Sequence, residues 1–205
     1  MPVHVATTEI MPPDPAVAAM AASVDDPRQF EVVFEQHVDQ IFRYAAMRVG
    51  AQAAEDVVAE TFATAFTRRA AFRAEQGSVR PWLYGIAAVH LLRRRDQELR
   101  WLEQCARGAA LEAPGGGDED EAADSAVSSA TARMLRPRIA RALERIPDGE
   151  RDVLLLHAVA GLTHLEIAAA LGIRKGTAKV RLSRATTRLR AMLHDLDPMT
   201  QGAPR

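Results

Sequence analysis

Apolar residues recur at spacings of three and four along much of the chain, and this period predicts helices that bury one face. The first helix begins at Phe30, and its expected buried stripe is Phe34, Val38, Ile41, Phe42 and Ala45. A second helix follows Gly50, with the stripe Val57, Val58, Phe62, Ala65 and Phe66. A third helix has Pro81 in its first turn, where a missing N–H costs nothing, and three consecutive arginines follow at its C-terminal end. Residues 30–106 are therefore predicted to form one small helical module.

The same pattern predicts a second helical module over residues 132–195. Pro137 is expected to open its first helix, and Asp148 to cap the next. Thr163 and Glu166 have the spacing of a capping box, and Gly172 is placed to end the short helix that follows. The last helix then turns Ala178, Leu182 and Ala185 inward.

Three further segments lack a sustained apolar stripe. Residues 107–131 are rich in Gly, Ser, Ala and acid, and we expect a flexible acidic linker. Residues 1–29 contain five prolines and predict a disordered tail, and residues 196–205 form a C-terminal tail. The predicted fold class is all-α: two small helical modules joined by the linker.

Charge is partitioned along the chain although the net charge is only -1. Residues 68–108 hold nine basic and four acidic residues, and residues 133–190 hold thirteen against five. Residues 109–130 hold six acids and no base. Each module thus carries a basic block, which indicates an anionic partner such as nucleic acid.

The last two helices have the pattern of a helix-turn-helix, whose second helix enters the major groove of DNA. With its apolar stripe inward, the final helix turns outward Gly176, Lys179, Val180, Ser183, Arg184 and Thr187. Cations on this face can meet phosphates or guanine edges, and Val180 can touch a thymine methyl. Arg174, Lys175 and Arg181 flank this face and are expected to hold phosphates.

Catalytic and metal chemistry finds little support in the sequence. Asp56 and Glu60 are one helical turn apart, but no Glu-x-x-His pattern accompanies them. Cys105 is the single cysteine, and the six histidines are scattered. We expect no metal, no cofactor and no enzyme activity of the chain itself. No run is long and apolar enough to insert into a membrane, so we expect a cytoplasmic protein.

Three stretches carry a family resemblance: "AEDVVAETFATAF", "RPWLYGIAAVHLLRRR" and "ALERIPDGERDVLLLHAVAGLTHLEIAAALGIRKGTAKVRLSRATTRLRAML". They resemble regions 2 and 4 of bacterial RNA polymerase sigma factors of the sigma-70 family, in the two-block arrangement of the extracytoplasmic-function (ECF) subfamily. The resemblance covers about residues 30–104 and 134–194. It implies a factor that binds core polymerase, recognises minus-ten and minus-thirty-five promoter elements and promotes DNA-templated transcription initiation.

The resemblance also implies which residues serve each partner. Region 4 would contact the beta flap and read double-stranded minus-thirty-five DNA through Arg174, Lys175, Thr177, Lys179, Val180, Arg181, Ser183 and Arg184. Region 2 would hold melted minus-ten DNA through Arg68, Arg69, Arg73, Arg80, Arg93, Arg94 and Arg95. The beta-prime clamp helices would dock on Glu55, Asp56, Val57, Glu60 and Phe62. Phe72 could stack on a base, but we favour it as a core residue.

The chain departs from the family pattern at several positions. Gly85 replaces a common Arg, Val89 and His90 stand where an Asn is usual, and Arg174 stands where many relatives have a capping Ser. The resemblance leaves open whether an anti-sigma protein is a further partner. An alternative is a LuxR-type helix-turn-helix transcriptional regulator with an N-terminal sensing or dimerisation module. Strands or an acidic phosphorylation pocket would mark such a module, and residues 30–104 predict neither.

Overall fold

The computed structural model of the protein describes residues 14–108 and 124–195, and in these residues it contains helices and no strands. Short 3-10 turns cover Pro27–Gln29, Arg69–Ala71 and Ala74–Gln76. The helices are α1 (Pro15–Ala22), α2 (Phe30–Val49), α3 (Ala51–Arg68), α4 (Val79–Arg93), α5 (Arg95–Ala106), α6 (Asp124–Arg145), α7 (Asp148–Ala158), α8 (His164–Leu171) and α9 (Lys175–Asp195).

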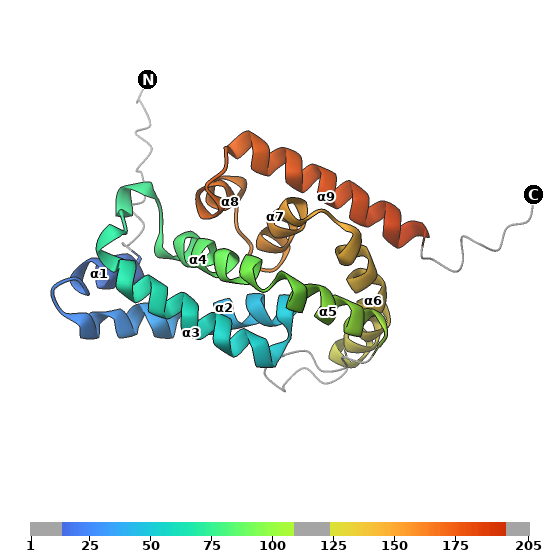
Figure 1. Cartoon of the computed structure of the whole chain (residues 1–205), viewed down its shortest axis with the longest axis horizontal. Helices are drawn as coiled ribbons and strands as arrows, with labels where there is room; N and C mark the ends of the chain where they lie inside the picture. Colours follow the sequence, from blue (N-terminus) through green and yellow to red (C-terminus); the bar gives the residue numbers. More distant parts are fainter. Residues whose placement is uncertain (1–13, 109–123, 196–205) are drawn as a thin grey trace, which may run out of the picture.

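Both predicted modules are present, and they pack against each other. In Figure 1, α4 and α5 run through the middle, with α1 to α3 on one side and α7 to α9 on the other. Helix α6 lies beside α5 and leads from the first module into the second. Buried apolar residues from Ala16 to Ala185 form one continuous cluster through both modules.

Local sequence explains the turn between α2 and α3. Gly50 ends α2 with a backbone φ of +84°, which residues that have a Cβ rarely adopt. A Cβ at Gly50 would also lie 3.0 Å from the Trp101 ring. The glycine therefore lets α5 approach the turn closely.

The N-terminal tail is where the structure first differs from the sequence prediction. Pro15 and Pro27 belong to the prolines that predict disorder, but each stands in the first turn of a short helix, where proline fits. The Asp14 carboxylate accepts a hydrogen bond from Ala16 N at 3.0 Å. Ala16 and Met20 are fully buried. The expectation of disorder is wrong for residues 14–29, while residues 1–13 lie outside the described residues.

Two helix boundaries in the second module also differ. Helix α6 begins at Asp124, inside the segment predicted as linker, and Pro137 lies within it instead of opening it. Pro removes only one hydrogen bond from this helix of 22 residues. Helix α7 has Pro147 as its N-cap, so Asp148 is its first residue, and its carboxylate pairs with arginines. Residues 109–123 of the predicted linker and 196–205 of the C-terminal tail lie outside the described residues.

The predicted stripe of α2 is correct in part. Ile41 and Ala45 are buried, and Val38 and Phe42 are half-buried against the core. Phe34 is 41% exposed, although its ring meets that of Phe62 edge-on at 4.8 Å between centroids. The stripe thus reaches the surface at its N-terminal end.

We expect Met20→Ala to lower the free energy of unfolding by about 2–5 kcal/mol, because it leaves a cavity where α1 meets the rest of the first module. The control is Val24→Ala, since Val24 is 45% exposed and such surface changes stay within about 0.5 kcal/mol. Urea unfolding followed by circular dichroism measures both. Equal stability of the two variants would show that α1 does not belong to the core.

Candidate nucleic-acid and polymerase interfaces

Helices α8 and α9 form the helix-turn-helix, and its local signals are all present. The backbone N–H of Thr163 donates to Glu166 Oε2 at 2.8 Å, and the N–H of Glu166 donates to Thr163 Oγ1 at 3.3 Å. Gly172 ends α8 in the left-handed conformation, at φ +63°. The predicted capping box and glycine turn are confirmed, and they set the angle at which α9 leaves α8.

The outward face of α9 is solvent-exposed. Ala178, Leu182 and Ala185 are buried, as their spacing predicts. Val180 is 48% exposed and has no packing role on this face. The exposed set is Gly176, Lys179, Val180, Ser183, Arg184 and Thr187. The face thus joins two cations, two hydroxyls and the methyl groups of Val180 on one helix, a combination suited to direct readout in the major groove.

The residues that flank this face fall into two groups. Arg174 and Lys175 are exposed at the start of α9. Thr177 and Arg181 are half-buried. The Arg181 guanidinium packs on the first turn of α7, 2.9 Å from the point where a Cβ on Gly149 would lie. Arg181 is therefore held against α7, whereas Arg174 and Lys175 face solvent.

Of the seven arginines predicted to hold minus-ten DNA, three are exposed: Arg68, Arg73 and Arg93. Arg69 is half-buried, donates from Nε to Ser23 O at 2.9 Å, and lies over the Phe66 ring at 4.1 Å from its centroid. It joins the turn after α1 to the end of α3, which is a structural role. The other three are held by acids or by the second module.

Arg94 is bound by an acid that was predicted to dock on polymerase. Its two terminal nitrogens lie 2.7 and 2.6 Å from the two carboxylate oxygens of Glu60. His90 Nδ1 is 3.0 Å from the same carboxylate. The hydrogen bonds between Arg94 and Glu60 lower the pKa of the Glu60 carboxyl and raise the pKa of the Arg94 guanidinium. One pair thus links the candidate polymerase face of α3 to the candidate DNA face of α4.

The predicted polymerase-binding residues of α3 divide by burial. Glu55, Asp56 and Glu60 are exposed. Val57 is 0% exposed and Phe62 5%, because both belong to the core of the first module. Their inclusion in a contact surface was wrong, since a buried side chain can only support the helix that carries the acids. Phe72 packs edge-on against Trp82 at 5.5 Å between centroids, on the core side that we favoured.

Arg80 and Gly85 bind the two modules together along α4. Arg80 donates from Nε to Gln40 Oε1 at 3.0 Å and from its terminal nitrogen to the carbonyl of Ala160, after α7. At Gly85, an added Cβ would lie 2.5 Å from the carbonyl oxygen of Ala170 in α8. The glycine that departs from the family pattern therefore lets α8 rest directly on α4.

A buried ion-pair network forms the second contact between the modules, and its first centre is Arg48. Arg48 Nε lies 2.7 Å from Glu98 Oε1, and its Nη2 lies 2.7 Å from Asp152 Oδ1. It also donates to the Tyr44 hydroxyl at 3.0 Å. The Arg48 and Glu98 side chains are both 3% exposed. Helices α2 and α5 of the first module thus bind α7 of the second through one guanidinium.

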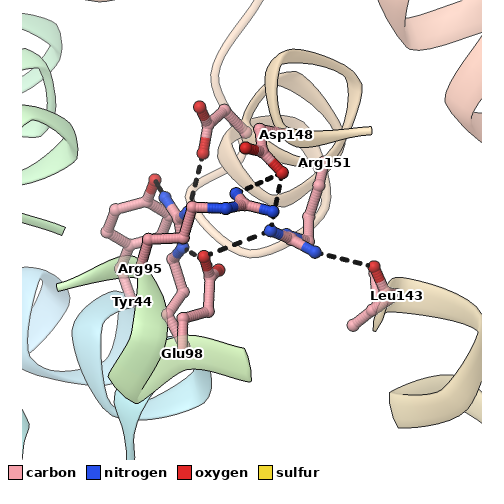
Figure 2. A network of polar contacts seen from close by, with 8 residues as sticks. Tyr44, Arg95, Glu98, Leu143, Asp148 and Arg151 are labelled. Carbon is pink, nitrogen blue, oxygen red and sulfur yellow. Dashed lines mark hydrogen bonds and ion pairs between the residues drawn. The ribbon is translucent and has the colours of Figure 1, made fainter. Parts of the chain in front are cut away.

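The second centre is Arg151, whose side chain is fully buried. It lies 3.4 Å from Glu98 Oε2 and 3.1 Å from Asp148 Oδ1, and it donates to Leu143 O at 3.0 Å. Figure 2 shows Asp148 between Arg95 and Arg151, with Glu98 reaching Arg151 from α5. Arg95, predicted to hold DNA, therefore pairs with an acid of the second module.

Burial alters the ionisation of this network. It raises the pKa of Tyr44 to about 12, against the opposing effect of Arg48. Burial likewise raises the pKa of Asp152, and Arg48 opposes that shift. Tyr44 therefore stays protonated at neutral pH and can donate its own proton while accepting from Arg48.

Sequence reasoning missed this network. Arg48 stands inside the apolar run "AAMRVG", and Arg151 stands just before the apolar run "VLLL". An arginine in the buried stripe of a helix was the available signal, because such a cation needs an acidic partner. Nothing in the spacing says that Glu98 is that partner. Within the residues that the structure describes, no group of acids, histidines and cysteine could hold a metal, and no helix could span a membrane.

Comparison with known proteins agrees with this division into two modules. Residues 33–101 match the family model for Sigma-70 region 2, and residues 136–189 match that for Sigma-70 region 4. RNA polymerase sigma factor CnrH of Cupriavidus metallidurans is 32% identical over 144 residues, which cover 68% of this chain and 72% of the relative. The chain belongs to the ECF subfamily of sigma-70 factors. This sigma factor acts in promoter recognition and transcription initiation.

Other similar proteins support the same family. ECF RNA polymerase sigma factor SigL of Mycobacterium tuberculosis is 29% identical over 165 residues, covering 80% of this chain and 88% of SigL. In fold, this sigma factor is similar to CnrH in its complex with the cytosolic domain of CnrY. The two folds superpose with a TM-score of 0.61 at 22% sequence identity, and the match covers 90% of this chain and 100% of the CnrH chain. The region 2 match over residues 33–101 decides against the LuxR-type alternative, which required a sensing module there.

We expect Gly85→Ala to loosen the contact between the modules, because the added Cβ meets the backbone of α8 and not a movable side chain. Within α4, alanine favours the helix over glycine by about 1 kcal/mol, so the first module should stay folded. Small-angle scattering should report a larger radius of gyration. Gly176→Ala is the matched control, since no atom lies within 4 Å of its added Cβ. An unchanged radius for Gly85→Ala would mean that α8 does not rest on α4 in solution.

Proposed function

We propose that α9 reads the minus-thirty-five element and that its exposed basic face carries the contact. The support is the confirmed capping box and glycine turn, followed by the exposed cations Lys179 and Arg184 beside Val180. Only the first turns of a recognition helix reach the base edges in such a motif. Arg174 and Lys175 then lie over the phosphates, and Arg181 positions α9 on α7.

We further propose that the exposed acids of α3 dock on the beta-prime clamp helices of core polymerase. Glu55 and Asp56 have no ion pair in the described part of the chain, so both charges are available to a cationic partner. Glu60 adds a third negative charge to this docking surface once its ion pair with Arg94 breaks. The second module contacts the beta flap. Polymerisation belongs to the core enzyme, and we assign this chain no catalytic step and place it with core polymerase in the cytoplasm.

Binding both promoter elements together requires the two modules to separate. The elements are named for positions about 25 base pairs apart, which is about 85 Å of duplex at 3.4 Å per pair. With α4 in contact with α8, the two DNA-binding faces are only a few helix diameters of about 10 Å apart. Separation also frees Arg80 and Arg95 for melted minus-ten DNA.

An anti-sigma protein completes the proposed set of partners. CnrH has been solved with the cytosolic domain of CnrY, and the sigma factor RpoE of Bartonella quintana with the anti-sigma factor NepR. The second match has a TM-score of 0.56 at 21% identity. Such a protein would act on this chain by favouring the packed arrangement of the modules.

We expect Lys179→Ala and Arg184→Ala to weaken promoter binding by the holoenzyme. Loss of a base contact should cost about 1–3 kcal/mol and relax specificity at one base pair. Loss of a phosphate contact should weaken all sequences alike and flatten the salt dependence. Binding to promoter fragments over a salt series separates the two cases. Arg100→Ala, an exposed arginine of α5, is the control, and wild-type affinity in both test variants would place DNA on another face.

We expect the double variant Glu55→Arg and Asp56→Arg to lose assembly with core polymerase, because it reverses two exposed charges across a complementary interface. Co-purification with core enzyme is the measurement. The matched control, Asp96→Arg with Glu144→Arg, makes the same charge change at two exposed positions outside α3. If test and control assemble equally well, α3 is not the docking helix.

A further inference from the structure

A cavity of about 590 Å³ lies between the two modules, beside the contacts that bind them. Helices α2, α4 and α5 of the first module form one wall, and α6 with Val159 of α7's C-terminal end forms the other. Large apolar side chains from both walls line it, among them Met47, Trp101, Ile139 and Leu143. Its volume is in the range of sites for small organic ligands, about 300–1,000 Å³.

The charge in this cavity is of one sign. Arg43, Arg80 and Arg136 line it, and no acid does so among the described residues. Arg80 is bound by Gln40 and the carbonyl of Ala160. Arg43 and Arg136 have no ion pair or side-chain hydrogen bond in the described part of the chain.

This excess of positive charge contrasts with the rest of the module interface. Arg48, Arg95 and Arg151 each face a carboxylate a short distance away. Arg136 is half-buried on α6 and lies near enough to Cys105 to oppose the rise that burial causes in the pKa of that thiol. A partly desolvated cation without an acidic partner, set in an apolar wall, favours an anionic ligand with an apolar body.

We propose that the cavity binds a medium-chain carboxylic acid, with its carboxylate at Arg136 and Arg43 and its chain along Trp101, Met47 and Ile139. The planar guanidinium fork matches a carboxylate in two hydrogen bonds, and the apolar lining residues suit an unbranched hydrocarbon chain. Each additional buried methylene should tighten binding about fourfold.

A ligand in this position contacts both modules, so its binding is linked to their packing. A molecule that binds only the packed arrangement stabilises that arrangement by mass action. Carboxylate binding then opposes the separation that promoter binding requires. This regulatory step rests on the proposed function, whereas the binding site itself does not.

The direct test is calorimetric titration of the full chain with three ten-carbon probes: decanoate, decanol and decyltrimethylammonium, each below its micellar concentration. Decanoate should bind at one site per chain, at least tenfold more tightly than decanol, and the cation should not bind. Octanoate should bind about fifteenfold more weakly than decanoate, because it lacks two methylenes. Equal affinity for decanoate and decanol, or no binding of decanoate, would overturn the proposal.

A matched pair of variants tests the position of the carboxylate. Arg136→Gln should weaken decanoate at least tenfold and leave decanol unchanged. Arg145→Gln changes an exposed arginine of the same helix outside the cavity and should leave both unchanged. In a Trp82→Phe background, Trp101 is the only tryptophan, and its emission should shift on saturation with decanoate. Equal losses in the two arginine variants, or no shift at Trp101, would place the ligand elsewhere.

Energy transfer between dyes on the two modules tests the regulatory step separately. Decanoate should raise the transfer efficiency of the wild-type chain, and Arg136→Gln should require at least tenfold more ligand for the same rise. Binding without any change in efficiency would remove the regulatory step and leave the site. Failure of the chain to support transcription with core polymerase would instead reject the proposed function, without touching the binding result.

Discussion

The packed arrangement of this sigma factor depends on a cluster of buried ions where α2 and α5 meet α7. Arg48 and Arg151 both share Glu98, and Asp152 and Asp148 complete their neutralisation. Removing one partner from such a pair leaves an uncompensated charge and typically costs about 3–5 kcal/mol. Replacing a whole buried ion-pair network by well-packed hydrophobic residues often leaves a protein as stable as before. The ions are therefore not needed for the stability of the interface alone. Their value at this interface is geometric, because the packed arrangement places a carboxylate against both Arg48 and Arg151 and thereby favours one registration of the modules.

Ions also suit an interface that opens when both promoter elements are bound, as we propose. When the modules separate, each charge regains water, whereas an apolar surface of the same size would stay exposed and promote aggregation. The contact at Arg80 is of the same kind, since it uses a carbonyl and an amide that water can replace. The interface thus differs from the cores of the modules, where Ile41, Val57 and Leu156 are almost wholly buried.

The sequence revealed what adjacent residues determine. Thr163 and Glu166 act in the first turn of α8 and Gly172 acts at its end, and the stripe of α9 follows from helical geometry. The helix-turn-helix could therefore be predicted from local sequence. Arg48 and Glu98 are fifty positions apart, and no local rule pairs them. Disorder does not follow from prolines that begin helices: Pro15 begins a helix whose alanines and Met20 find their partners only in the folded module. The family resemblance identifies the helix that contacts polymerase but not which of its faces does so. It therefore does not separate the buried Val57 and Phe62 from the exposed acids of the same helix. Burial distinguishes the two faces, and burial depends on the tertiary fold.

Gly85 gives this arrangement an evolutionary property. The close approach of α8 to α4 depends on the absence of a Cβ at Gly85. A glycine codon becomes an alanine codon by the change of a single nucleotide. A single mutational step at Gly85 is therefore expected to weaken the packing of the modules, with the candidate DNA-reading face of α9 and the acids of α3 left intact. A lineage whose habitat changes could retune how readily its factor engages polymerase while preserving the set of promoters that it recognises.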